Sequence, residues 1–345
     1  MFRPDVAYQV TKELLEQGVH YFIGLYTSAS RKRILPLLDQ FDGLLLYPTQ
    51  YEGKEAHSSV IYCGPTPNQS LLSFVPWLMQ EEGTRFALIG SDYIYPREMN
   101  VYLHALMKQY GGSIVRESYF SLGERSFERE LNKIEQLRPD VIFSTLVGDS
   151  VIHFYEQSEL LTPHIPIAST ITSETEFAEM QLTGEQRHYS CFPYFQSSTN
   201  ASNARFLNDF NVPLVSSAME GAYNCVHLLA EGMNKANHPS EVKTKMTNRM
   251  HSAPRGDIFV DPDNQHVHMK TRIGEHEADG RFQVRFESEK RVAPTPFTFL
   301  DKKLQRRQRP QSPMTTGSPC YSSRSLNRLV STLIRSSCSR VTAIC

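Results

Sequence analysis

The sequence predicts an α/β fold with two lobes, each a mostly parallel sheet with helices on both faces. Short apolar strands alternate with amphipathic helices from residue 5 to about residue 248, and this alternation is typical of parallel sheets covered by helices. The chain has 345 residues, which is long enough for two separate cores. Because the expected strands exceed what one open sheet usually holds, we predict two sheets, with the break after about residue 112.

The first elements illustrate the pattern. A helix over residues 5–17 carries an apolar face, and a strand over 21–25 then enters the polar loop 26–30. The next helix, 31–41, has apolar residues Ile34, Leu37 and Leu38 at helical spacing. A strand over 43–47 follows and enters a second polar loop. These elements form one βαβ unit.

The alternation continues through the chain. We expect strands over 60–62, 86–90, 113–119, 141–145, 166–169 and 188–193, and helices over 65–80, 96–110, 126–137, 149–159, 173–180, 202–210, 215–235 and 240–248. From Ala253 short strands alternate with turns. The predicted domains are a first ligand-binding lobe at 1–112, to which part of the chain after 250 returns, a second lobe at 113–250, a strand-rich segment at 251–301 and a tail at 302–345.

The tail differs from the rest in composition. Residues 302–345 contain nine Lys and Arg residues and no acidic residue, and they are rich in Ser, Pro and Gln. This composition predicts a disordered basic tail. The rest of the chain then holds 27 basic and 37 acidic residues, a net charge of −10, so we expect no direct binding of nucleic acid.

Hydroxyl groups gather where the first two strands of the βαβ unit end. Tyr26 and Ser28 follow one strand, and Tyr47 and Thr49 lie at the end of the next. The carboxyl ends of parallel strands share one sheet edge, where open α/β sheets bind ligands. The alternative is structural, with Ser28 or Ser30 as a helix N-cap and the tyrosines as packing residues. The hydroxyls favour a small neutral polar ligand.

Other functions find little support in the sequence. No apolar run is long enough to span a membrane, and residues 1–5 lead into a polar helix rather than a signal peptide. The six cysteines lack metal-binding spacing, and three of them read as buried thiols. His266 and His268 have no evident third metal ligand, so we interpret them as exposed strand residues. With no catalytic or phosphate-binding motif, we predict no enzyme activity, no cofactor and no metal.

Several longer stretches carry a resemblance. They are Thr27-Ser28-Ala29-Ser30-Arg31-Lys32, Leu46-Tyr47-Pro48-Thr49-Gln50-Tyr51-Glu52-Gly53, Pro65-Thr66-Pro67-Asn68-Gln69, Gly90-Ser91-Asp92-Tyr93-Ile94-Tyr95-Pro96-Arg97, Met219-Glu220-Gly221-Ala222-Tyr223 and Ala278-Asp279-Gly280-Arg281-Phe282. Over about residues 5–300 the chain resembles the periplasmic-binding-protein type I family, in its group of urea and short-chain amide receptors. The resemblance implies a two-lobed fold that closes on an amide by a hinge.

The resemblance also implies site residues and partners. Tyr26, Ser28, Tyr47, Thr49 and Tyr93 would be ligand contacts from the first lobe, and Thr170 and Tyr194 would come from the second. A urea or amide receptor of an ABC transporter would meet its permease in the periplasm. The alternative is a cytosolic amide-sensing regulator of an amidase operon that sequesters an antiterminator protein. As the sequence stands, the missing signal peptide favours the cytosolic alternative. This absence counts for little, because compared with the family the start of the chain looks lost, and the periplasm is expected if the missing segment carries a signal peptide.

Two features concern the ligand and the first lobe. An amino-acid receptor needs an acid for the ammonium group, and Glu174 is a candidate, but its place after Ser173 suits the start of a helix equally. Compared with the family, the chain begins after the usual first strand–helix–strand segment. The strand at 21–25 should therefore be an apolar sheet edge that invites aggregation, or pairing with a second copy in a homodimer.

Overall fold

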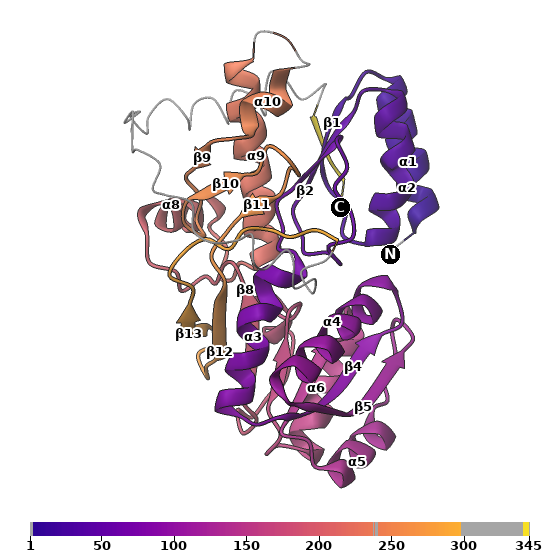
Figure 1. The fold of residues 1–345 in the computed structure, drawn as a ribbon, viewed down its shortest axis with the longest axis vertical. Coiled ribbons are helices and arrows are strands. Elements are labelled where there is room, and N and C mark those ends of the chain that lie inside the picture. The colour runs from indigo at the N-terminus through magenta and orange to yellow at the C-terminus, as the bar shows by residue number, and fades with distance from the viewer. Residues whose placement is uncertain (1–2, 237, 239–240, 298–340, 345) are drawn as a thin grey trace.

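The computed structural model describes residues 3–236, 238, 241–297 and 341–344. The chain folds into two lobes, shown one above the other in Figure 1. The upper lobe contains α1 (Pro4–Glu16), β1 (Tyr21–Gly24), α2 (Ser28–Gln40), β2 (Leu44–Tyr47), β3 (Val60–Tyr62), α9 (Ser217–Lys235), α10 (Val242–Met246), β9 (Met250–His251), β10 (Ile258–Val260), β11 (Val267–His268) and β14 (Val341–Ile344). We call this the first lobe.

The lower, second lobe contains the remaining elements. They are α3 (Pro67–Glu81), β4 (Arg85–Ser91), α4 (Ile94–Tyr110), β5 (Ser113–Phe120), α5 (Glu128–Leu137), β6 (Val141–Thr145), α6 (Asp149–Leu161), β7 (Ile167–Ser169), α7 (Glu174–Phe177), β8 (His188–Phe192), β12 (Arg272–His276) and β13 (Phe282–Glu287). Helix α8 (Ala201–Phe210) lies on the path from β8 to α9.

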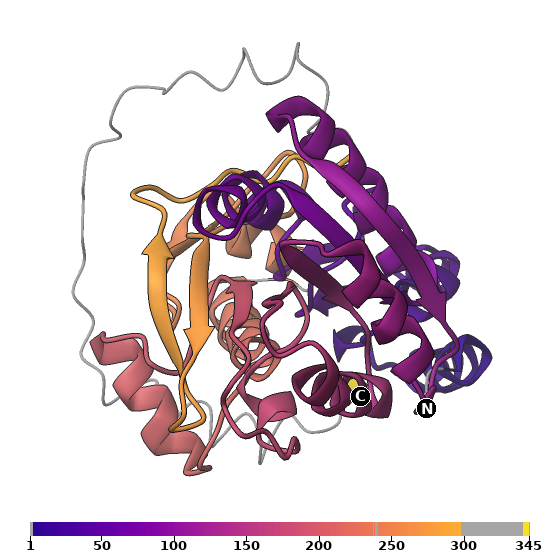
Figure 2. The same ribbon diagram turned by 90° about the horizontal axis from the view of Figure 1, so that it is seen from below.

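Each lobe is built around its own sheet. The first-lobe strands have the order β14-β1-β2-β3, all parallel, and a small antiparallel sheet has the order β11-β10-β9. The second-lobe order is β13-β12-β8-β7-β6-β4-β5. Figure 2 shows β12 and β13, in orange, at the opposite side of this lobe from the purple strands. The predicted two-lobed α/β architecture is confirmed.

Alternating residues of the first-lobe strands explain how helices cover both faces of the sheet. Phe22 and Leu45 pack with apolar residues of α1 and α2, whereas Ile23 and Leu46 pack with those of α9 and α10. All four side chains are at most 5% exposed. Because both faces are covered, each strand is apolar throughout, as expected for a buried parallel sheet.

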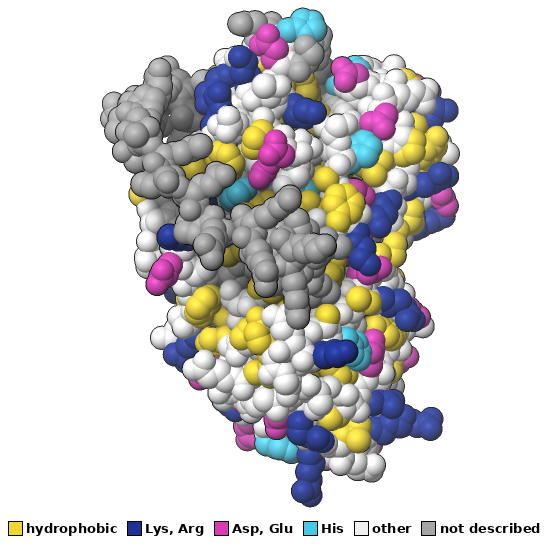
Figure 3. Space-filling view, in the orientation of Figure 1, with side chains coloured by type: hydrophobic (Ala, Val, Ile, Leu, Met, Phe, Trp, Pro, Cys, Tyr) yellow, Lys and Arg dark blue, Asp and Glu magenta, His cyan; other side chains and the backbone are white. Residues whose placement is uncertain are grey.

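The second lobe repeats this arrangement. Leu88 and Phe143 face a cluster that includes residues of α3 and α4, and Ile89 and Ile142 face a cluster from α5 and α6. Among the helices of the described part of the chain, none is long and apolar enough to cross a membrane. Figure 3 shows acidic and basic side chains interspersed on one face of both lobes.

The structure divides the chain differently from the sequence-based boundary near residue 112. Strand β4 pairs with β5 and β6 of the second lobe, so the break between the sheets lies between β3 and β4. Likewise, α9 packs on the first-lobe sheet although it was assigned to the second lobe. The segment expected at 251–301 is split, because β10 and β11 join the first lobe while β12 and β13 extend the second-lobe sheet.

The expectation that residues 21–25 form a sheet edge is also wrong. Strand β1 lies between β2 and β14, with Tyr21 opposite Val341 and Gly24 opposite Ile344. Residues 341–344 of the predicted disordered tail therefore form a strand, while 302–340 and 345 lie outside the described residues.

Candidate functional site

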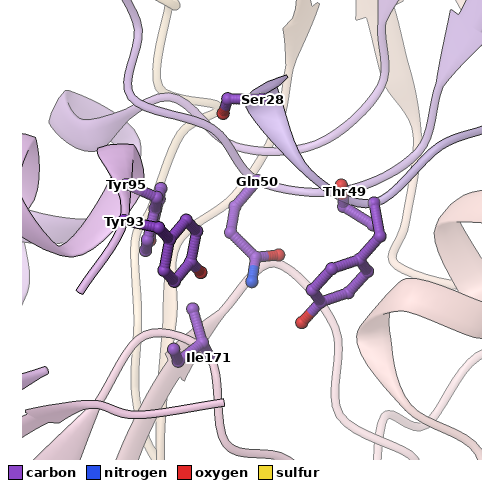
Figure 4. A pocket seen from close by; sticks show the side chains of 7 residues that line it. Ser28, Thr49, Gln50, Tyr93, Tyr95 and Ile171 are labelled. Carbon is purple, nitrogen blue, oxygen red and sulfur yellow. The ribbon is translucent and has the colours of Figure 1, made fainter. Parts of the chain in front are cut away.

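A pocket lies between the two lobes, at the carboxyl ends of their parallel strands. Its empty volume is about 260 Å³, part of which is open to solvent. It is lined by residues that follow β1 and β2 in the first lobe and β4 and β7 in the second: Tyr26, Ser28, Thr49, Gln50, Tyr93, Tyr95 and Ile171. In Figure 4 the Gln50 side chain extends toward the middle of this set, with Tyr93 and Tyr95 on one side.

The first-lobe lining residues are placed by the βαβ unit. The Thr27 side chain caps α2 by accepting a hydrogen bond from the Ser30 N–H at 3.3 Å. The helix therefore begins at Ser28, three residues earlier than predicted, and the cap is Thr27 rather than Ser28 or Ser30. This start brings Ser28 to the pocket, where it is only 3% exposed.

Thr49 adds a second hydroxyl from the end of β2. Its side chain is buried near the Tyr47 phenol, but its Oγ1 makes no hydrogen bond of ordinary geometry to a described residue. A buried hydroxyl without a partner is costly, and this one lines the pocket. Thr49 thus has the capacity to bond a ligand.

Tyrosines form much of the remaining wall. The Tyr95 phenol lies 3.1 Å from Thr170 Oγ1, and burial raises the pKa of Tyr95 well above its usual value. Tyr47 lies behind this wall and donates a hydrogen bond to the backbone carbonyl of Tyr26 at 2.7 Å. The Tyr95 phenol is therefore neutral at physiological pH, and its single hydrogen goes either to Thr170 or to a ligand.

The structure brings together four of the seven residues predicted for the site. Tyr26, Ser28, Thr49 and Tyr93 line the pocket, although Tyr93 belongs to the second lobe rather than the first. The other three do not line it. Tyr47 and Thr170 lie behind lining residues. Tyr194 is buried and donates to Asn203 at 2.8 Å.

Sequence reasoning missed Gln50, Tyr95 and Ile171. Each is a direct neighbour, or a neighbour but one, of a residue that was predicted, namely Thr49, Tyr93 and Thr170. Their position in these loops could therefore have identified them, because several residues of one loop at a strand end reach the same pocket.

Behind Ser28 lies a buried group of charged side chains. Glu52 is fully buried and accepts a hydrogen bond from the Ser28 hydroxyl. Arg31, also fully buried, places Nη2 at 3.3 Å from Glu52 Oε1 and Nε at 2.8 Å from Glu55 Oε1. Lys32 adds a contact of 2.8 Å to Glu52 Oε1. Burial alone would raise the pKa of Glu52, but Arg31, Lys32 and Ser28 together lower it.

Glu174 is a second buried acid, near the loop that carries Ile171. It starts α7, as the sequence suggested, and its Oε1 accepts from the Gln196 N–H at 2.9 Å. Its Oε2 has no partner among the described residues. Burial raises the pKa of Glu174 to about 7. Glu174 does not line the pocket.

The candidate metal ligands have other roles. His266 is buried rather than exposed and stacks on Tyr62 with ring centroids 4.1 Å apart. His268 lies 2.9 Å from Asp261. Within the described ranges, no three His, Cys, Asp or Glu residues are grouped to hold a metal ion. Cys63, Cys191 and Cys225 are free and buried, in agreement with the expectation that three cysteines are buried thiols.

Two lobes with mostly parallel sheets and a polar pocket between their strand ends define a class of binding proteins that enclose a small ligand between domains. Residues 4–303 match the family described as periplasmic binding protein domain. The chain belongs to this family.

Solved structures share the fold at low sequence identity. A solute-binding protein of an ABC transporter from R. palustris, in complex with 4-hydroxybenzoate, is 20% identical with a TM-score of 0.76, covering 88% of this chain and 86% of that chain. The leucine-, isoleucine-, valine-, threonine- and alanine-binding protein from Brucella ovis, in a closed conformation, is 14% identical with a TM-score of 0.73, covering 85% and 84%.

A curated relative matches only a part of the chain. Limonene hydroxylase from Geobacillus stearothermophilus is 26% identical over 124 residues, which are 33% of this chain and 23% of that protein. The chain thus spans less than a quarter of the length of this relative.

Proposed function

We propose that this chain binds urea or a short aliphatic amide in the interlobe pocket, without chemical change, as the solute-binding component of an ABC transporter. One observation carries the choice of ligand: the seven lining residues are all uncharged, and they combine hydroxyls, phenols and one carboxamide. Such groups pair with the carbonyl and N–H groups of an amide, and every buried polar atom of the ligand needs a partner.

Charged ligands fit this lining less well. A benzoate or an amino acid carries a carboxylate, and a buried carboxylate needs a cation or several strong donors. Arg31, the buried cation behind Ser28, already pairs with Glu52 and Glu55.

Membership of the periplasmic-binding-protein family supports the transport role. Structures of the same fold include solute-binding proteins of ABC transporters. The proposed partner is accordingly an ABC permease, and the proposed place of action is the periplasm.

Calorimetry against urea, formamide, acetamide, leucine and 4-hydroxybenzoate tests the proposed ligand. We expect binding of urea or an amide and little heat with the two carboxylates. Ser28→Ala and Thr49→Val should each weaken amide binding by about 1–3 kcal/mol, because a polar group of the ligand loses its partner in a closed site. Tight leucine or benzoate binding with no amide heat would refute the proposal.

Thr11 offers a matched control for Thr49. It is fully buried in α1, and its Oγ1 also has no partner among the described residues. It does not line the pocket. Thr11→Val should therefore leave amide affinity unchanged. Equal losses for Thr11→Val and Thr49→Val would show that Thr49 acts only through stability.

A further inference from the structure

Ser28 and its buried neighbours Glu52 and Arg31 form a continuous chain of hydrogen bonds that ends at the pocket. Ser28 Oγ bonds one oxygen of Glu52, and the other oxygen faces Arg31 at 3.3 Å and Lys32 at 2.8 Å. Glu52 and the Arg31 side chain are fully buried. The two ends of the Glu52 carboxylate therefore have different surroundings: a hydroxyl at one, two cations at the other.

The hydrogen bond between Ser28 and Glu52 has only one direction. An ionised carboxylate accepts hydrogen bonds and cannot donate them, whereas a serine hydroxyl has a single hydrogen. Two cations beside Glu52 keep it ionised, and its pKa is lowered despite burial. The one hydrogen of Ser28 is thus held by Glu52, and only lone pairs of Ser28 Oγ remain for the pocket.

We propose that Glu52 fixes Ser28 as a hydrogen-bond acceptor, so that this end of the pocket selects ligands with an N–H donor and rejects carboxylates. This inference rests on the proposed function and adds the physical basis of its specificity. An amide or urea N–H group finds an acceptor at Ser28. A carboxylate oxygen placed there meets the lone pairs of another oxygen, with no hydrogen between them. Glu52 is a positioning residue, since it acts through Ser28.

Thr49 supplies the contrast within the same pocket. Its hydroxyl lies beside the Tyr47 phenol but makes no hydrogen bond of ordinary geometry among the described residues, so its hydrogen can turn toward a ligand. The first lobe thus presents an acceptor at Ser28 and an available donor at Thr49, and these complement the N–H and C=O ends of one amide group.

Glu52→Gln reverses the polarity of Ser28. The glutamine oxygen should remain beside Arg31 and Lys32, because turning its NH₂ group toward two cations is unfavourable. Its NH₂ group then replaces the oxygen that faces Ser28, donates to Ser28 Oγ, and frees the serine hydrogen for the pocket. The measured quantity is the ratio of acetamide to acetate affinity, by calorimetry at pH 7. We expect this ratio to fall by roughly tenfold or more in Glu52→Gln, since one good hydrogen bond becomes a donor–donor clash.

Glu55→Gln is the matched control. Like Glu52→Gln, this substitution removes one negative charge beside Arg31, because Glu55 accepts a hydrogen bond from Arg31 Nε. Ser28 donates to Glu52 and not to Glu55. The affinity ratio should stay at the wild-type value in this variant. If acetamide still binds the wild type in preference to acetate and both variants keep that preference, the inference is overturned while the proposed function stands.

A second measurement needs no ligand. The guanidinium chloride midpoints of the wild type, Ser28→Ala, Glu52→Gln and the double variant form a double-mutant cycle. We expect clear non-additivity between Ser28 and Glu52, and additivity when Glu55→Gln replaces Glu52→Gln. If the wild type binds neither amide nor urea, the proposed function fails. A non-additive cycle would then still show that Ser28 and Glu52 are coupled, as the inference requires, and an additive cycle would overturn the chain of hydrogen bonds.

Discussion

Removing the Arg31 guanidinium should destabilise the first lobe severely. The Arg31 side chain is fully buried, pairs with both Glu52 and Glu55, and lies over the rings of Tyr47 and Tyr51 at 4.7 and 4.6 Å. In Arg31→Met the methionine side chain fills the space of the apolar part of Arg31. Glu55, however, loses its contact with the Arg31 cation, and Glu52 retains only its contact with Lys32. Breaking a buried ion pair on one side costs about 3–5 kcal/mol, and lost cation–π contacts add about 1 kcal/mol.

The same helix provides a control for this substitution. Arg33 is 53% exposed, lies 3.5 Å from the exposed Asp5 and covers the ring of Tyr8. An exposed pair of this kind contributes about 0–1 kcal/mol, so Arg33→Met should change stability little. Chemical unfolding followed by circular dichroism measures both variants, and hydrogen exchange at β1 and β2 locates the loss.

The stability lost in Arg31→Met should decrease as the pH falls. In the wild type the pKa of Glu52 is lowered in the folded state, so its stabilising contribution is present above the unfolded pKa and is lost as pH falls through the folded value. Without Arg31, burial should dominate and raise that pKa. The destabilisation by Arg31→Met should therefore be largest at pH 7 and shrink as the pH falls, because Glu52 of the variant takes up a proton at a higher pH than Glu52 of the wild type.

A rescue experiment completes this prediction. Adding Glu52→Gln and Glu55→Gln to Arg31→Met removes the uncompensated charges and should recover at least half of the lost stability. A loss below about 1 kcal/mol at pH 7, or a loss that grows on acidification, would refute the view that Arg31 compensates two buried acids.

Three further predictions follow from local geometry. Gly64→Ala should weaken amide binding and cost about 1–3 kcal/mol of stability, because its Cβ would lie 1.9 Å from the Thr49 backbone oxygen; unchanged affinity would show that the Thr49 loop adapts. Glu174→Gln should stabilise the protein above pH ~7 but not near pH 4.5, since burial raises the pKa of Glu174 to about 7 and the unfavourable ionisation is then absent; a pH-independent effect in unfolding titrations would contradict this. Deleting residues 341–345 removes β14 and exposes the edge of β1, so sedimentation should show self-association; a monomeric product with unchanged exchange at β1 would speak against it.

The position of the site could be predicted from the sequence because it depends on local order. A strand, a polar loop, a helix and a second strand already place Ser28 and Thr49 at one sheet edge, and in the structure both line the candidate pocket. The apolar strands likewise indicated burial on both faces. These inferences need only the direction of the strands and the period of the side chains.

The division into lobes could not be found in the same way. Strands of both lobes have the same apolar character, so the sequence does not show that β4 pairs with β6 rather than with a first-lobe strand. Pairing is a long-range property. For this reason Tyr93, which lines the candidate pocket, was assigned to the wrong lobe.

Local sequence patterns also did not predict the buried charges. Arg31 and Glu52 lie in polar loops or at a helix start in the sequence, where charged residues usually face solvent. Both are fully buried, because each is the partner of the other. Only the tertiary contact between the helix after β1 and the loop after β2 shows that the Ser28 hydroxyl has a fixed direction.

The distribution of these groups between the lobes has a consequence for recognition. Ser28, Thr49 and Glu52 all belong to the first lobe, whereas the second lobe contributes Tyr95 and Ile171 to the lining, together with Tyr93. The second-lobe side chains are aromatic or aliphatic, and they add buried area and phenol groups to the pocket. Under the proposed function, the first lobe would therefore make the choice between an N–H group and a carboxylate. Enclosure of the ligand against the second lobe would strengthen that choice, since excluding water raises the cost of every unpaired polar atom.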